Sequence, residues 1–310
     1  MDRRDFIKKT FAASALAAAA GTTLPFGNKS NLWALGSGML QNPYDMVAIK
    51  GGEPDAMFDK AIASLGGMSK FVKKGQTVVV KPNIGWDVTP EKGANTNPKL
   101  VKRIVQHCFN AGAKEVFVFD HTCDTWTNCY SNSGIERAAK DAGAKVVSAA
   151  NEGYYQQVKI KNGKRLTNAK IHELILSSNV FINVPILKNH GGAKITASMK
   201  NLMGIIWDRE FMHKNDLHQT IADLASFRKP DLNVVDAYYV MKNHGPRGVS
   251  KEDVVTMKSQ IVSTDIVATD AAAIKLFGMD PESIDYLKYA SDMKLGRKDL
   301  DKLNINRIKI

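Results

Sequence analysis

Short apolar segments alternate with amphipathic segments along most of the chain. Residues 76–80 and 180–184 are rich in Val and Ile, and each has the length of a buried strand. Residues 98–110 instead carry apolar side chains at helical spacing, and Gly112 closes this segment. Strands and helices in alternating order predict an α/β fold with a mostly parallel sheet flanked by helices.

The same pattern predicts the remaining elements. Strands are expected at residues 46–49, 76–80, 116–119, 145–147, 180–184, 232–235 and 260–262. Helices are expected at residues 55–65, 98–110, 133–142, 195–206, 217–227, 265–277 and 281–293. Asn162-Gly163 predicts a hairpin, and Ser133 with Glu136 predicts a capping box. We expect residues 45–310 to form a single α/β domain, and the pattern leaves open a second lobe that starts near residue 180.

The first residues have the order of a bacterial export signal. Arg3 and Arg4 precede two apolar residues and two lysines, and an alanine-rich run with an A-x-A-like site at Ala18 and Ala20 follows. The roughly 14 apolar residues are too few to span ~30 Å of hydrocarbon, which argues against a membrane anchor. We therefore expect the signal region, residues 1–34, to be removed after the twin-arginine machinery delivers the protein to a periplasmic or other extracytoplasmic location.

The chain is basic, with a formal charge of +12. Removal of the signal region, with its five Lys/Arg and two Asp/Glu, leaves +9. A basic surface favours anionic partners, but the lysines are scattered and no basic run is interleaved with aromatic residues, so no nucleic-acid partner is predicted. No second long apolar segment follows the signal, so we expect no stable membrane insertion after cleavage.

The three cysteines are too few for a disulfide scaffold or for a four-cysteine iron–sulfur cluster. Cys108 falls on the apolar face of its predicted helix, which indicates a buried thiol. Cys123 and Cys129 lie six residues apart in one irregular stretch, and an oxidising compartment favours a disulfide between them. A metal site beside His121 and a pair of free thiols are the alternatives.

Polar side chains gather where the predicted strands end. Lys81 and Asn83 follow the strand at 76–80, His121 follows the strand at 116–119, and His190 comes after the strand at 180–184. Parallel sheets bind ligands outside the carboxyl ends of their strands, so these positions predict one shared site.

Two further histidines, His213 and His218, are five residues apart. This spacing suits two metal ligands only if a loop intervenes. Neutral imidazole is the commonest metal ligand and also the usual acid–base group near neutral pH, whereas solvated or capping histidines are the plain alternative. His107 and His172 are interpreted as structural.

Several motifs together resemble the domain of unknown function 362 family over about residues 45–280. They are Val80-Lys-Pro-Asn83, Thr96-Asn97-Pro98, Phe181-Ile-Asn-Val-Pro185, Leu187-Lys-Asn-His190, Met199-Lys-Asn-Leu-Met-Gly204, His218, Gly245-Pro246 and the segment from Asp265 to Asp270. Some members of that family carry an iron–sulfur ferredoxin segment, for which this chain has no cysteine cluster. The family name states no activity.

The order of the site residues is more distantly similar to the N-terminal domain of nickel-pincer lactate racemases. In those enzymes a histidine follows a strand, and a second histidine opens a glycine-rich segment. A lysine ten residues later is tethered to a nickel-bearing nucleotide, and a further histidine ligates the nickel. The corresponding order in this chain is His121, His190, Lys200 and then His213 or His218. The glycine-rich segment is only partly matched, because residues 193–199 differ from it.

These observations predict a metal- or anion-binding site at the strand ends. In the enzyme interpretation, an isomerase or oxidoreductase acts on a hydroxy or carboxylate compound, with His121 and His190 as general acid and base. Lys81, Asn83 and Lys200 would bind an anionic ligand or cofactor, and His213 or His218 would ligate a divalent metal. The alternative is a non-catalytic periplasmic protein that binds or delivers a metal or small solute.

Overall fold

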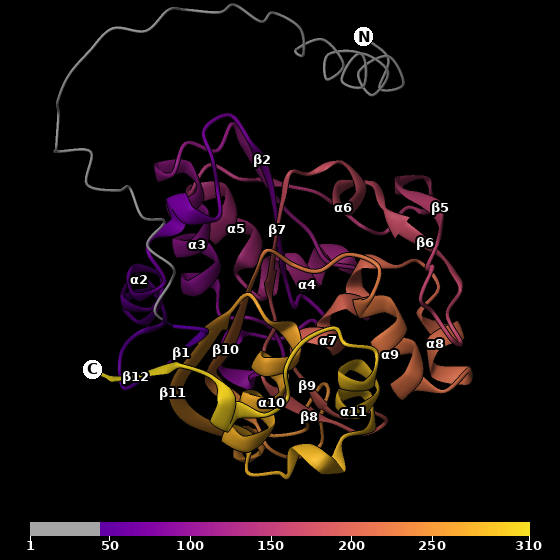
Figure 1. Cartoon of the computed structure of the whole chain (residues 1–310). Coiled ribbons are helices and arrows are strands. Elements are labelled where there is room, and N and C mark those ends of the chain that lie inside the picture. Colours follow the sequence, from indigo (N-terminus) through magenta and orange to yellow (C-terminus); the bar gives the residue numbers. More distant parts are fainter. Residues whose placement is uncertain (1–43) are drawn as a thin grey trace, which may run out of the picture. The chain divides into compact units, whose positions relative to one another are not determined.

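The computed structural model describes residues 44–310, which build one eight-stranded sheet and two two-stranded sheets (Figure 1). The predicted signal region, residues 1–34, lies outside the described residues. The strand order of the large sheet is β12 (Ile305–Lys309), β1 (Met46–Lys50), β11 (Val254–Ser263), β10 (Leu232–Met241), β7 (Val180–Val184), β2 (Thr77–Pro82), β3 (Glu115–Val118) and β4 (Lys145–Val146).

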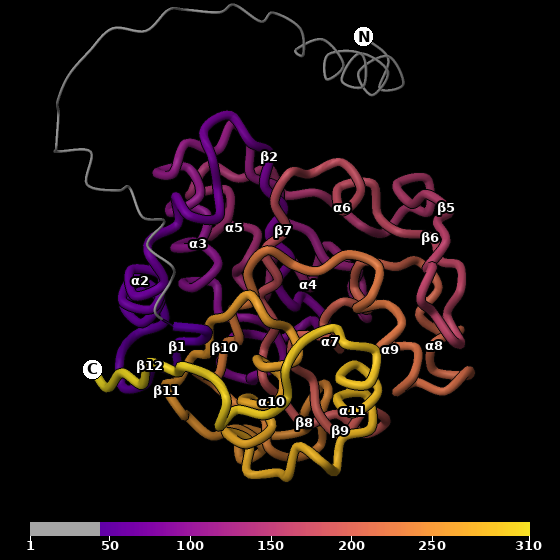
Figure 2. The backbone as a smooth tube through the Cα atoms, viewed as in Figure 1, coloured from indigo at the N-terminus to yellow at the C-terminus, as the bar shows by residue number. Residues whose placement is uncertain are grey.

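Most neighbouring strands of this sheet run parallel. β10, β7, β2, β3 and β4 form one parallel group, and β12 is parallel to β1. β11 runs antiparallel to both of its neighbours, β1 and β10. In the backbone trace the C-terminal strand β12 returns to lie beside β1 (Figure 2). The predicted α/β fold with a mostly parallel sheet is confirmed.

Helices cover both faces of the sheet, because successive strand side chains point to opposite sides. Val78 and Val80 pack into one apolar cluster, whereas Val79 packs into the other. The first cluster also contains side chains of α2 (Pro54–Ser64), α3 (Pro98–Asn110), α4 (Trp126–Asn132) and α5 (Ile135–Asp141). The second contains side chains of α6 (Glu173–Ser177), α7 (Ser198–Asn201), α8 (Arg209–Lys214), α9 (Leu217–Ala225), α10 (Ile266–Phe277) and α11 (Asp285–Asp292).

The helix α3 shows how local sequence sets these elements. Its apolar positions Leu100, Val101, Ile104, Val105 and Cys108 are all buried, as their spacing predicts. The side chain of Asn97 accepts a hydrogen bond from the backbone of Lys99, which caps the helix, and Pro98 occupies the first turn.

Two predicted local features are wrong. The helix expected at 195–206 is divided among β9 (Lys194–Thr196), α7 and a short 3₁₀ helix, η4 (Leu202–Ile205). β9 pairs with β8 (Lys188–His190), and this pairing holds residues 194–196 extended. The capping box expected at Ser133 does not form, because α5 begins after Gly134 in a left-handed conformation.

The predicted hairpin is confirmed and forms a separate two-stranded sheet. β5 (Tyr155–Lys159) pairs antiparallel with β6 (Asn168–His172). Gly163 lies in the connection, where a Cβ atom would come within 2.1 Å of the Leu166 carbonyl oxygen. A residue with a side chain could not occupy this turn without a backbone shift.

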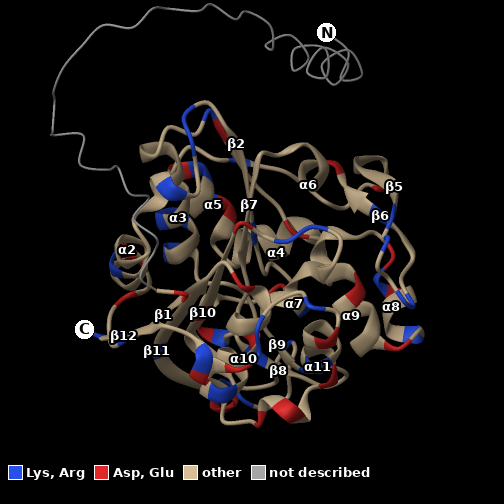
Figure 3. Cartoon of the chain, in the orientation of Figure 1, with Lys and Arg blue, Asp and Glu red and all other residues tan. Residues whose placement is uncertain are grey.

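Charged residues are distributed over most elements, with Lys and Arg interspersed among Asp and Glu (Figure 3). Among residues 44–310, no helix combines the length and the apolar character that a membrane crossing requires.

Candidate functional site

A cavity of about 510 Å³ lies at the carboxyl ends of β2 and β3 and beside the loop segment that follows β7. We call it the strand-end cavity. All five residues for which the sequence predicts one shared site line it: Lys81, Asn83, His121, His190 and Lys200. His213 lines it too. These residues span 132 positions of sequence, so only the fold brings them together.

One lysine of the cavity forms an ion pair with a neighbouring carboxylate. The Lys81 ammonium lies 2.7 Å from the Asp120 carboxylate, and both side chains are almost fully buried. The other Asp120 oxygen accepts a hydrogen bond from the Ile84 backbone at 2.7 Å. Burial lowers the pKa of Lys81, and the neighbouring Asp120 opposes this shift. Lys81 is therefore a compensated cation.

Gly204 makes room for this ion pair. A Cβ atom at this position would lie 1.8 Å from an Asp120 oxygen and 2.7 Å from the Lys81 nitrogen. The Gly204 carbonyl also accepts a hydrogen bond from the His121 backbone at 3.1 Å. The glycine thus lets η4 pack directly against the ion pair.

A second lysine has only neutral partners. Lys188 is 2% exposed, and its ammonium donates hydrogen bonds to the side-chain oxygen of Asn83 at 3.2 Å and to the Ala94 carbonyl at 2.5 Å. Burial lowers the pKa of Lys188 to about 7, and the nearby Lys200 and Lys81 act in the same direction. Asn83 is held in turn by donating to Asn201 at 2.9 Å.

The third lysine has no partner at all among the described residues. Lys200 is 9% exposed, and its ammonium forms no hydrogen bond and no ion pair with residues 44–310. Burial lowers its pKa to about 8. An ammonium without a partner is strongly disfavoured in a buried position, so this group calls for an anion.

The backbone around Lys200 is fixed from a distant part of the chain. Asp270, on α10, accepts hydrogen bonds from the backbone of Ser198 at 2.5 Å and of Met199 at 3.0 Å. These contacts start α7, which ends at Asn201 and carries Lys200. Burial raises the pKa of Asp270 to about 7.

Two of the cavity histidines, His121 and His190, have opposite hydrogen-bonding roles. His121 Nδ1 lies 2.9 Å from the Ile206 carbonyl, which can only accept, so Nδ1 carries the proton and Nε2 is an acceptor. His190 Nδ1 accepts the Ala193 backbone N–H at 3.1 Å, so in the neutral ring the proton is on Nε2. One ring therefore offers a free base, and the other offers an N–H donor.

Both rings are held neutral. Burial lowers the pKa of His121, and the Arg209 charge adds to this effect. Burial, then Lys200 and Lys188, lower the pKa of His190 to about 2. His190 therefore stays uncharged at every physiological pH as long as no anion occupies the cavity.

Arg209, on α8, links this helix to the loop that follows β3. Its guanidinium donates to the carbonyl oxygens of His121 at 2.9 Å and Thr122 at 2.5 Å, and to the Cys123 sulfur at 3.3 Å. These three contacts fix the segment that presents His121 to the cavity.

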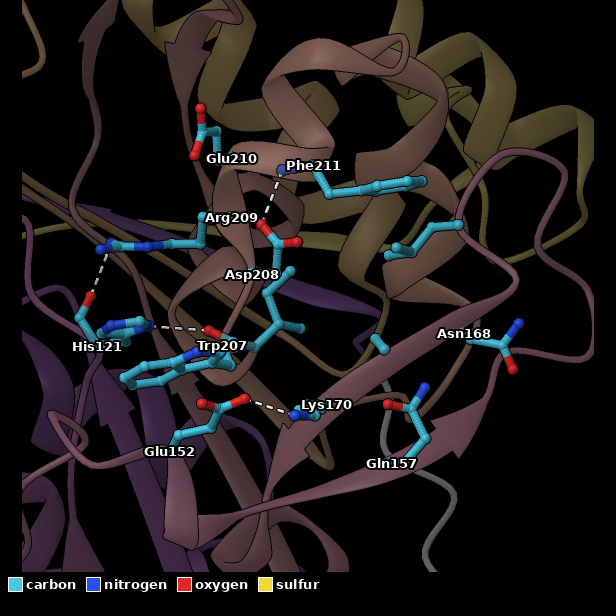
Figure 4. Close-up of a pocket in the computed structure, with 13 residues that line it drawn as sticks. His121, Glu152, Gln157, Asn168, Lys170, Trp207, Asp208, Arg209, Glu210 and Phe211 are labelled. Atoms are coloured by element: carbon cyan, nitrogen blue, oxygen red, sulfur yellow. Dashed lines mark hydrogen bonds and ion pairs between the residues drawn. The ribbon is translucent and has the colours of Figure 1, made fainter.

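A second cavity, whose lining residues Figure 4 shows, shares His121, Arg209 and Glu210 with the strand-end cavity. It measures about 680 Å³ and opens between the β5–β6 hairpin and α8, so we call it the hairpin cavity. The His121 ring stacks on Trp207 there, with ring centroids 5.2 Å apart. Lys170 pairs with Glu152 at 2.5 Å, and Asp208 caps the Phe211 backbone at 2.9 Å.

The predicted metal ligands are not brought together. His213 stacks beside His190, with centroids 6.3 Å apart, but His218 is not part of the cavity wall. His218 instead stacks on Tyr286 and accepts its backbone N–H at 3.3 Å. Across residues 44–310, no three His, Cys, Asp or Glu side chains come close enough together to hold a metal ion. That His213 or His218 ligates a metal therefore stays a prediction, and of the two only His213 lines the strand-end cavity.

The predicted disulfide is also wrong, because all three cysteines are free thiols. Cys108 and Cys129 are buried, and burial raises their pKa values to about 12 and about 11. The Cys129 thiol donates to the Gly85 carbonyl at 3.8 Å, whereas the exposed Cys123 contacts Arg209 and lines the strand-end cavity.

The sequence analysis names Cys123 only as an alternative metal ligand beside His121, and it assigns no role to Lys188, Arg209 or Asn201, which also line the strand-end cavity. Lys188 stands in the Leu187-Lys-Asn-His190 motif, so its place beside His190 was the available signal. Arg209 has no such signal, because its partners are mainly backbone carbonyls of a loop more than 80 residues away.

Comparisons with known proteins agree with the family resemblance. The model of a family described as "Domain of unknown function (DUF362)" matches residues 78–275. A thylakoid-associated protein of Synechocystis is 25% identical over 240 residues, covering 75% of this chain and 72% of that protein.

Two solved structures are similar at low sequence identity. The lactate racemase apoprotein from Thermoanaerobacterium thermosaccharolyticum has a TM-score of 0.47 and 12% identity, with 76% of this chain covered. A Thermotoga maritima protein has a TM-score of 0.46 and 11% identity, with 78% of this chain covered. The matches span 57% and 60% of those longer chains.

Proposed function

The chain belongs to the domain of unknown function (DUF362) family, and we propose that it binds a small carboxylate or hydroxy acid in the strand-end cavity. One observation carries this proposal: Lys200 is only 9% exposed, and its ammonium has no partner within residues 44–310. Lys188 adds a second cation that has only neutral acceptors. A bound carboxylate would supply the missing negative charge.

We propose that the bound compound undergoes proton transfer, as an isomerase or oxidoreductase would require. His121 would act as the base through Nε2, since its Nδ1 proton is engaged by the Ile206 carbonyl. His190 would polarise the substrate as a neutral Nε2–H donor, since its low pKa excludes a charged ring. No step is assigned to a metal ion, because the described residues do not gather a ligand set.

A calorimetric titration of the full chain tests the binding step. Oxalate, lactate and pyruvate are the probes, and neutral acetamide is the control. Lys200→Met should weaken carboxylate binding at least tenfold, because it removes a charge-assisted contact worth about 1.5–3 kcal/mol. Lys170→Met is the matched control, because that lysine lines the hairpin cavity. Equal affinity of the wild type and Lys200→Met would refute the proposal.

A second candidate function is binding without catalysis, as in a delivery protein. The pKa of His190, about 2, favours it, because such a ring cannot give up a proton as an imidazolium. The two functions differ in a measurable way. In D₂O, an enzyme whose base removes the C2 hydrogen as a proton exchanges that hydrogen of a bound hydroxy acid, and His121→Asn should abolish this exchange, whereas a binding protein leaves that hydrogen in place.

We propose that the protein works outside the cytoplasm after twin-arginine export. The support is the Arg3–Arg4 signal pattern, which lies outside the described residues, and the relative named as thylakoid-associated. Replacing both arginines by lysine keeps the charge, so it should stop twin-arginine export while general secretion would continue. Normal levels of the double variant outside the membrane would contradict this route.

A further inference from the structure

One nucleophilic side chain of the strand-end cavity has no role in the function proposed above. Cys123 is exposed, lies in the loop after β3 and lines the cavity together with Lys188 and Lys200. Its sulfur accepts a hydrogen bond from Arg209 Nη1 at 3.3 Å, and its backbone N–H is held by the Gly85 carbonyl at 2.8 Å. The sulfur is thus both accessible and fixed in position.

An independent feature of the same cavity points to an anionic ligand. Lys200 is nine-tenths buried and unpartnered among the described residues, and Lys188 meets only neutral acceptors. Uncompensated charges in a cleft raise the local concentration of oppositely charged molecules. An anion drawn to these lysines therefore arrives beside the Cys123 sulfur.

The carboxylates near this sulfur are already engaged. Asp120 pairs with Lys81, and Asp124 accepts the Asp87 backbone N–H at 3.1 Å and lies 3.6 Å from Arg247. Glu210, which lines the rim, is 73% exposed and pairs with Lys214 at 2.5 Å. Their negative charge is thereby offset, so the cationic character around Cys123 comes from Lys188, Lys200 and Arg209.

We infer that Cys123 is a nucleophile that adds covalently to anionic electrophiles held by Lys188 and Lys200, with 2-oxo acids as the substrate class. The inference rests on the proposed carboxylate site. In the addition, the sulfur forms a bond to the C2 carbonyl carbon and the carbonyl π electrons move to oxygen. The thiol proton ends on that oxygen, which gives a thiohemiketal without oxidant or reductant. The carboxylate of the 2-oxo acid stays at the lysines.

Alkylation with two reagents that differ in charge tests whether Lys188 and Lys200 direct anionic electrophiles to Cys123. Iodoacetate and iodoacetamide both form an S–C bond and release iodide, and the thiolate attacks the CH₂ carbon of each. Their rate ratio at one cysteine therefore cancels the thiolate fraction and reports only how the site treats the negative charge. Mass spectrometry of the full chain follows Cys123, while the buried Cys108 and Cys129 serve as internal controls.

The ratio of iodoacetate to iodoacetamide rates at Cys123 should exceed that of free N-acetylcysteine at least tenfold. Lys188→Gln and Lys200→Gln should each lower the ratio severalfold, and Lys170→Gln, in the hairpin cavity, should leave it unchanged. Added salt should lower the wild-type ratio without any substitution. A wild-type ratio equal to that of N-acetylcysteine would overturn the inference. So would a ratio that neither lysine substitution nor added salt changes.

The adduct itself is observable with [2-¹³C]pyruvate. The wild type should convert part of the ketone carbon signal into that of a tetrahedral carbon, and Cys123→Ser should not. Cys123→Ser should still bind oxalate by calorimetry, because the lysines remain. If oxalate binds but neither the adduct nor the rate preference occurs, the inference that Cys123 is a nucleophile is refuted, whereas the proposed carboxylate site is supported. If oxalate binds to neither protein, the proposed function itself fails.

Discussion

The hairpin cavity, at about 680 Å³, is larger than the strand-end cavity, at about 510 Å³, and the two share His121, Arg209 and Glu210. In the hairpin cavity, Glu152 forms an ion pair with Lys170, and Asp208 accepts a hydrogen bond from the α8 backbone. In the strand-end cavity, Lys188 and Lys200 meet no carboxylate among the described residues. Uncompensated buried charge, rather than volume, distinguishes the cavity that is prepared for a ligand.

Gly204→Ala should have the largest effect on the strand-end cavity. The added Cβ would meet the Asp120 carboxylate and the Lys81 ammonium, and it would force the buried ion pair apart. We expect a loss of about 3–5 kcal/mol in the free energy of unfolding, measured by urea denaturation of the full chain. Gly191→Ala is the matched control, because open space surrounds a Cβ there. Equal stability of the two variants would show that η4 can move away from the pair.

Replacement by Met should change the free energy of unfolding in opposite directions at Lys81 and at Lys200. Lys81→Met leaves Asp120 buried without its partner and should destabilise the protein by about 3–5 kcal/mol. Lys200→Met removes an unpartnered ammonium and replaces it with an apolar side chain of similar length. We expect this change to stabilise the ligand-free protein by about 1–3 kcal/mol at pH 7. A destabilising Lys200→Met would mean that the ammonium already has a partner.

Substitutions in the hairpin cavity should have the smallest effect on carboxylate binding. Phe211 and Gln157 line only that cavity. Phe211→Ala and Gln157→Ala should change the oxalate dissociation constant by less than about twofold, because no charge is added to or removed from the lysine cluster. A tenfold loss with either variant would show that the two cavities act as one site.

The sequence predicts the framework of the site better than its electrostatics. Apolar strands such as β2 and β7 and the capped helix α3 follow from local pattern, so the convergence of Lys81, His121 and His190 on one sheet edge could be expected. The helix expected at 195–206 shows the limit. Its apolar spacing fits a helix, but pairing of β8 with β9 and the contacts of Asp270, 72 residues from Ser198, restrict the helix to Ser198 onward.

The remaining site residues depend on contacts that no local pattern reveals. Arg209 is placed by backbone carbonyls of the loop after β3, and His218 is withdrawn from the cavity by Tyr286 on α11. Sequence alone also cannot tell a compensated lysine from an uncompensated one. Lys81 and Lys200 look equivalent in the sequence, and only the fold gives Lys81 a carboxylate.

Proton uptake on carboxylate binding tests the central claim most directly. With pKa values of about 7 and about 8, Lys188 and Lys200 are largely neutral at pH 8.5 in the empty cavity, whereas a bound dianion favours their charged forms. Calorimetry of oxalate binding in two buffers with different ionisation enthalpies should give an uptake of about one to two protons at pH 8.5 and close to none at pH 6. Affinity should fall as pH rises above about 7, where Lys188 first loses its proton in the empty cavity, and more steeply above about 8, where Lys200 follows. Binding at pH 8.5 without proton uptake, or with unchanged affinity from pH 6 to 9, would contradict the account.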